Sequence, residues 1–237
     1  MSFEVIPAID VAAGQLALHT ADGPRPLEAF GGDPLAAARA YAEAGVRRVH
    51  VVDLDLAFGG AFANLDVVRE AVALGLRVQA SGGIATLTEA SEALAAGADR
   101  VVLGSAALLD EADTREAIEA LGARAIVGIE VEDGRIRPRG RSEGDLPLAE
   151  TLGWLVASGA TGFLVTAVAR VGAMRGPDLA SLTRVIRVGR PVLAAGGIAS
   201  LDDLRELRQA GAAGAVVGRA ALEGGLHLAQ ALAEFGA

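Results

Sequence analysis

Short apolar runs alternate with longer amphipathic stretches along almost the whole chain. The runs are rich in Val, Ile, Leu and Ala and lack the polar alternation of half-exposed strands. They are also too short for helices, so the pattern predicts buried strands of a parallel sheet. The eight predicted strands are Glu4–Ile9, Val46–Asp53, Arg77–Ala80, Arg100–Leu103, Ala125–Ile129, Gly162–Thr166, Pro191–Ala194 and Ala213–Val217.

The stretches between these runs are rich in Ala, Leu, Glu and Arg and predict helices. Gly97 and Gly211 directly follow two of them, as a glycine that terminates a helix does. Eight strand–helix units in 237 residues fit an eight-stranded α/β barrel, although local pattern alone leaves an open, doubly wound sheet as an alternative. The clearest predicted helices are Pro34–Ala44, Leu65–Ala73, Thr88–Ala96 and Leu201–Ala210.

An internal repeat favours the barrel. Val78–Leu108 aligns without a gap with Val192–Leu222, 114 positions later, and 16 of the 31 paired residues are identical. A repeat of this length indicates two half-barrels of four strands each, because it is far longer than a solenoid repeat. We therefore predict a single (β/α)8 TIM barrel over residues 1–237, with half-barrels of about 1–120 and 121–237.

Composition excludes several classes of chemistry. The chain has no cysteine, hence no disulfide and no thiolate nucleophile, and all 21 basic residues are arginine, so no lysine can form a Schiff base. A net charge of −9 argues against a nucleic-acid partner. The three histidines have no metal-binding spacing, and no run approaches the ~20 apolar residues of a membrane span. Because the N-terminus also lacks a basic signal region, we expect a cytoplasmic protein. We further expect a monomer without a metal or membrane partner.

Glycines follow the strands in both halves of the repeat. In this fold the working surface is the C-terminal end of the strands, where glycine lets backbone amides approach an anion near a helix N-terminus. Two such sets predict two phosphate sites facing each other, and so a ligand with phosphate at both ends. The alternative is that these glycines only form tight turns. The predicted phosphate-binding residues are Gly82, Gly83, Gly104, Ser105, Gly196, Gly197, Gly218 and Arg219.

Carboxylates end the first and fifth predicted strands. Asp10 and Glu130 occupy related positions in the two halves, so their side chains are expected to reach one cavity from opposite walls. Two such groups can serve as a general acid and a general base. The alternative roles are a loop cap for Asp10 and a solvated loop residue for Glu130. Asp53 and Thr166 end two further strands as possible substrate contacts, and Asp53 is equally typical of a structural hydrogen-bond acceptor.

The most basic stretch of this acidic chain is Arg135–Asp145, which follows the fifth strand. It is expected to overhang the working face, where its arginines, including Arg141, either clamp phosphate or carboxylate groups or remain solvated.

Several motifs that resemble those of a known family follow one another in order through nearly the whole chain. They are Ile6-Pro7-Ala8-Ile9-Asp10, His50-Val51-Val52-Asp53-Leu54-Asp55, Ser81-Gly82-Gly83-Ile84, Leu103-Gly104-Ser105-Ala106-Ala107, Gly176-Pro177 and Ala195-Gly196-Gly197-Ile198-Ala199-Ser200-Leu201.

This series resembles the histidine-biosynthesis isomerases that act on phosphoribosylformimino-aminoimidazole carboxamide ribotide (ProFAR). It is most similar to the actinobacterial branch, phosphoribosyl isomerase A, which also isomerises phosphoribosylanthranilate for tryptophan synthesis. The resemblance implies an Amadori rearrangement of an aminoaldose to an aminoketose, from ProFAR to PRFAR, without metal or cofactor. It also implies that Asp10 is the base, that Glu130 stands where the family has an aspartate acid, and that Gly176 belongs to the phosphate-binding set.

The chain departs from the family pattern at several polar positions. Ala167, Val171 and Ala173 stand where the family has two carboxylates and a hydroxyl, and Ala85 and Ala17 stand where it has arginines. A tryptophan of the fifth loop is replaced, in our alignment, by Arg141.

These departures leave three hypotheses. The first is an isomerase of the bisphosphorylated substrate. The second is a diverged paralogue that binds phosphorylated ligands without this activity. The third is an isomerase of phosphoribosylanthranilate only, which would fill one phosphate site.

Overall fold

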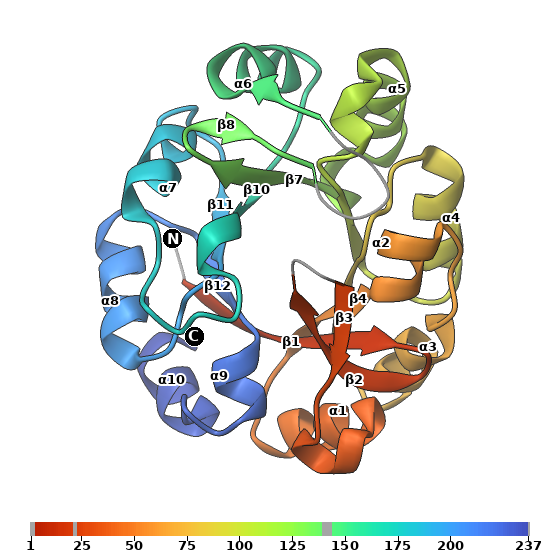
Figure 1. Ribbon diagram of the computed structural model, residues 1–237, viewed down its shortest axis with the longest axis vertical. Helices are drawn as coiled ribbons and strands as arrows, with labels where there is room; N and C mark the ends of the chain where they lie inside the picture. The colour runs from red at the N-terminus through yellow and green to blue at the C-terminus, as the bar shows by residue number, and fades with distance from the viewer. Residues whose placement is uncertain (1–2, 21–22, 139–143, 237) are drawn as a thin grey trace.

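A computed structural model describes residues 3–20, 23–138 and 144–236 of the chain. Eight parallel strands form a ring that helices surround on the outside (Figure 1). The ring closes because β10 pairs with β7 as well as with β11, and β1 lies between β12 and β4. This closure confirms the TIM barrel and excludes the open sheet. The barrel strands are β1 (Glu4–Ala12), β4 (Arg48–Asp53), β5 (Arg77–Ser81), β6 (Arg100–Leu103), β7 (Ala125–Glu132), β10 (Phe163–Ala167), β11 (Val192–Ala195) and β12 (Gly214–Val217).

All eight predicted strands are present, and the first and fifth extend three residues further than predicted, to Ala12 and Glu132. β1 continues past Asp10 because its end forms an antiparallel hairpin with β2 (Gln15–Thr20), which pairs in turn with β3 (Gly23–Pro26). β7 continues past Glu130 for the same reason, since it pairs with β8 (Arg135–Ile136), and β8 with β9 (Leu146–Pro147). Asp10 and Glu130 therefore lie within strands, whose pairing fixes their backbones.

The four clearest predicted helices are confirmed to within one residue at each end. The helices pack apolar faces against the outside of the barrel, and a separate small cluster that includes Ile6, Val102 and Leu164 fills its interior. The α-helices are α1 (Pro34–Glu43), α2 (Leu54–Gly59), α3 (Leu65–Ala73), α4 (Leu87–Ala95), α5 (Glu111–Leu121), α6 (Leu148–Ala157), α7 (Leu179–Ile186), α8 (Leu201–Gln209), α9 (Arg219–Leu222) and α10 (Leu228–Phe235). Within the described ranges, 3-10 turns lie at Ala29–Gly32, Ala107–Leu109, Gly122–Arg124 and Val168–Arg170.

The sequence repeat has a structural counterpart at the starts of α4 and α8. The hydroxyl of Thr86 accepts the backbone N–H of Glu89, whose side chain accepts the N–H of Thr86 in return. Ser200 and Asp203 form the same capping box 114 positions later. In the described part of the chain, no helix combines the length and apolar character needed to cross a membrane.

Candidate active site

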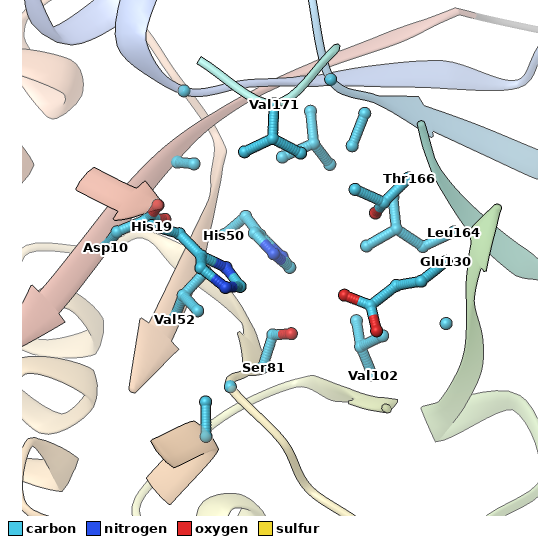
Figure 2. Close-up of a pocket in the computed structure, with 18 of the residues that line it drawn as sticks. Asp10, His19, His50, Val52, Ser81, Val102, Glu130, Leu164, Thr166 and Val171 are labelled. Atoms are coloured by element: carbon cyan, nitrogen blue, oxygen red, sulfur yellow. The ribbon is translucent and has the colours of Figure 1, made fainter. Parts of the chain in front are cut away.

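A pocket opens at the C-terminal end of the barrel strands, and side chains from both halves of the molecule point into it (Figure 2). Its inner wall is apolar, with Val52, Val102 and Leu164 among its residues, and Thr166 lies on β10 beside them. The structure brings most of the predicted site residues together here. Those that line the pocket are Asp10, Gly82, Gly83, Gly104, Ser105, Glu130, Thr166, Gly196, Gly197, Gly218 and Arg219.

Asp10 and Glu130 lie on opposite walls of this pocket (Figure 2). They are the two carboxylate residues that line it among the described parts of the chain. The hydroxyl of Ser105, which is 2% exposed, donates a short hydrogen bond to Oε2 of Glu130. Ser105 thus uses its side chain to orient Glu130, and only its backbone amide is left for an anion.

The paired glycines have a structural explanation of their own. All four have positive φ values, from 78° at Gly83 to 109° at Gly82. A Cβ at Gly82 would lie 2.2 Å from the carbonyl oxygen of Asp53, and one at Gly197 would lie 2.2 Å from that of Gly176. The turns therefore require glycine whether or not a phosphate binds, so the glycines themselves do not decide between the two predictions.

The hydrogen bonds of the backbone amides distinguish a phosphate site from a simple turn better than the glycines do. The N–H of Gly104 donates to the carbonyl of Ile84, and the N–H of Gly176 donates to that of Gly197, so both serve the turns. Gly176 is also not one of the residues that line the pocket.

Within the described residues, by contrast, the amides of Ser105 and Ala106 have no acceptor, and neither have those of Arg219 and Ala220, 114 positions later. Two successive unpaired donors at each of two related places are suited to bind an anion.

Asp53 does not lie where a substrate contact was predicted. Its side chain is 4% exposed and does not line the pocket. Its two oxygens accept the backbone N–H groups of Leu56, Ala63 and Asn64, and the side-chain amide of Asn64 at 2.8 Å. These four donors occupy the carboxylate, so Asp53 caps α2 and anchors the loop behind the site. This is the structural acceptor role that the sequence left open.

Arg219 carries the guanidinium group of the described lining. Its Nε lies 2.9 Å from both carboxylate oxygens of Glu223, and its Nη1 donates to the carbonyl of Gly172 at 3.2 Å. Arg141 lies outside the described residues. In the same long loop, Arg135 forms an ion pair with Asp145 at the exposed base.

Only some of the positions that depart from the family pattern line the pocket. Val171 lines the pocket, and its side chain points toward the cavity in Figure 2, whereas Ala167 and Ala17 are buried away from the pocket. Leu18, the neighbour of Ala17, lines the pocket instead. The wall between the two carboxylates is consequently more apolar than the resemblance implies.

Two histidines that the sequence analysis did not single out lie in this pocket. His19 comes from β2, and its ring meets that of Phe58 edge to face at 5.3 Å between centroids. His50 comes from β4 and is 5% exposed. The alternation of β4 could have identified His50, because it lies two residues before Val52 and so shares its inward-facing side. No group of three or more potential metal ligands occurs among the described side chains.

Nearly the whole chain is similar to known proteins. Residues 4–227 match the family model described as histidine biosynthesis protein. A protein of Renibacterium salmoninarum is 40% identical over 98% of this chain and 96% of its own length. It is named 1-(5-phosphoribosyl)-5-((5-phosphoribosylamino)methylideneamino)imidazole-4-carboxamide isomerase. The phosphoribosyl isomerase A of Mycobacteroides abscessus is 42% identical over 98% of this chain and 99% of its own.

Proposed function

Because this chain belongs to the histidine biosynthesis protein family, we propose that it is the isomerase of the bisphosphorylated aminoaldose after which its relatives are named. The reaction is an internal redox step, in which C2 of the ribose is oxidised to a carbonyl and C1 is reduced. The protein has to open the ribose ring and move protons. Carboxyl groups can perform both tasks as general acids and general bases.

The observation that carries this proposal is the opposed pair of carboxylates. Glu130 would protonate the ring oxygen as the sugar opens to an imine, and Asp10 would then take the proton from C2. The resulting enolamine loses the proton of its C2 hydroxyl and gains one at C1, which yields the aminoketose with no net change in atoms. Asp10 and Glu130 reach the substrate from opposite sides because they lie on β1 and β7, across the barrel (Figures 1 and 2).

The repeated amide pairs support a substrate with two phosphates. One pair, at Ser105 and Ala106, follows β6, and the other, at Arg219 and Ala220, follows β12 on the opposite side of the ring. A bisphosphorylated ribotide would place one phosphate at each pair and its reacting ribose between them. A substrate with one phosphate would leave one pair of donors unpaired.

The apolar residue at position 171 supports the proposal that Glu130 is the acid. The family resemblance places an aspartate there, whereas Val171 lines this pocket. With Asp10 as the base, Glu130 is the remaining carboxylate of the described lining and the group that has to act as acid. Its side chain is one methylene longer than an aspartate, and Ser105 restricts its position.

Turnover of the bisphosphorylated aminoaldose by the purified protein tests this function. Asp10→Asn and Glu130→Gln keep the size of each side chain and remove its proton chemistry, so both should lower kcat by about 100-fold or more. Asp55→Asn is a matched control, because Asp55 is a carboxylate near the same strand ends that does not line the pocket. Phosphoribosylanthranilate measured in parallel reports whether the substrate with one phosphate is also used.

Turnover that requires Asp10 and Glu130 would support the proposal. Binding of the bisphosphorylated substrate without turnover would refute the isomerase and favour a phosphate-binding paralogue. Turnover of phosphoribosylanthranilate alone would favour the third hypothesis.

A further inference from the structure

His50 lies at the base of the pocket, between the two carboxylate walls in the view of Figure 2. Its side chain comes from β4, the central element between β1 and β5, so the backbone that carries it is paired on both sides. It is 5% exposed and yet borders the cavity. An imidazole in this position presents one nitrogen to the protein and the other to the ligand.

The neighbours of His50 determine which nitrogen carries the proton. Arg100 donates from Nε to Oε1 of Gln79 at 2.6 Å, and Nε2 of Gln79 lies 2.8 Å from Nδ1 of His50. A guanidinium can only donate, so the amide oxygen of Gln79 has to face Arg100. The NH₂ group therefore faces His50, whose Nδ1 has to accept. The proton of the neutral ring is then on Nε2.

Burial keeps the ring of His50 neutral. Burial, aided by the positive charge of Arg100, lowers the pKa of His50 to about 3. Asp10, Glu130 and His19 face the same cavity, and the described side chains provide no hydrogen-bond acceptor for Nε2 of His50. The base of the pocket thus holds an uncharged N–H group with no acceptor among the described side chains.

We infer that His50 donates its Nε2–H to the C2 oxygen of the reacting ribose, and that Gln79 and Arg100 are positioning residues that maintain this tautomer. The inference rests on the proposed function. The C2 oxygen changes from a hydroxyl to a carbonyl in the rearrangement, and a fixed donor stabilises the negative charge that it gains on the way. No bond to His50 changes, because a neutral imidazole in this tautomer gives a hydrogen bond and keeps its proton.

Nitrogen-15 NMR of the histidine rings tests the tautomer independently of activity. The chain has three histidines, and the signals of His50 are those lost in His50→Gln. The wild type should show Nε2 protonated and Nδ1 as an acceptor, unchanged from about pH 8 to about pH 5. Gln79→Glu retains an acceptor for Arg100 but has no donor for His50, so the proton should move to Nδ1. Gln230→Glu, on the exposed face of α10, is the matched control.

Kinetics test the role of the donor. Loss of a preorganised donor to a developing oxyanion lowers kcat about 100-fold, so His50→Met and Gln79→Glu should both do so while KM changes less than about threefold. His50→Gln, whose amide N–H can reach the Nε2 position, should recover part of kcat. Melting temperatures establish that each variant is folded.

Two results would overturn the inference: a wild-type ring protonated on Nδ1, or a tautomer change in Gln79→Glu that leaves kcat unaltered. If the wild type lacks turnover altogether, the proposed function fails, and ribose 5-phosphate then serves as the NMR probe. A shift of the Nε2–H signal on its addition, absent in Gln79→Glu, would support His50 as a donor to sugar oxygens. No shift would refute it.

Discussion

At the scale of single residues, the site depends on side chains that orient other side chains. Ser105 is the clearest case, because its buried hydroxyl donates a hydrogen bond to Glu130. In Ser105→Ala, Glu130 loses this restraint and samples other orientations, so kcat should fall about tenfold with KM nearly unchanged. Steady-state kinetics with Ser91→Ala as control, whose hydroxyl bonds to the exposed helix carbonyl of Leu87, would measure this. A rise in KM at constant kcat would instead identify the Ser105 hydroxyl as a phosphate ligand.

The buried imidazole of His50 should also make folding sensitive to acid. Its pKa is about 3 in the folded protein against a usual value of 6.5. Between these values the unfolded chain binds a proton that the folded protein does not, so stability falls as the pH falls from 6.5. The loss is about 1 kcal/mol for each pH unit below 6. Denaturant unfolding at several pH values should show a shallower decline in His50→Gln, and parallel curves for the two proteins would contradict the prediction.

At the scale of elements, the glycine turns should be structural requirements of unequal strength. Gly197 and Gly159 have nearly the same φ, 83° and 88°. A Cβ at Gly197 would overlap the carbonyl of Gly176 at 2.2 Å, whereas one at Gly159 would meet nothing within 4 Å.

Gly159→Ala should therefore cost only the backbone strain of about 1 kcal/mol. Gly197→Ala should cost about 3 kcal/mol, because the backbone of the turn has to move as well. Denaturant unfolding of the two variants separates the cost of the close contact with Gly176 from the cost of backbone strain. Equal losses in the free energy of unfolding would show that the turn after β11 is able to adjust.

The elements also show what the sequence can and cannot predict. The barrel strands and the repeat were predictable because buried parallel strands are continuous apolar runs and because the two halves retain 16 identical pairs. The hairpin that extends β7 was not, since β8 and β9 have two residues each and no apolar pattern. Asp53 and His50 could not be assigned for another reason: their roles depend on Asn64 and Gln79, which only the folded chain brings close.

At the scale of the whole molecule, the end of the barrel opposite the pocket is held by buried charge. Arg48, at the start of β4, is 7% exposed. Its Nη1 lies 3.2 Å from the carboxylate of Glu4 on β1, and its Nη2 lies 2.6 Å from that of Asp99, just before β6. This one side chain thus ties together three segments of the ring, at the end that serves stability in such barrels.

Arg48→Met should separate stability from catalysis. The variant leaves two half-buried carboxylates without their shared cation, which costs about 3 kcal/mol and lowers the melting temperature by about 10 °C. Its kcat at about 25 °C should stay within about threefold of the wild type, because the pocket lies at the other end of the strands. Arg69→Met is the control, since its ion pair with Asp66 is exposed and worth less than about 1 kcal/mol. If kcat fell in step with stability, the two ends of the barrel would be coupled, and Arg100 would be the residue to examine, because it lies 3.4 Å from Glu4 and also donates to Gln79 beneath His50.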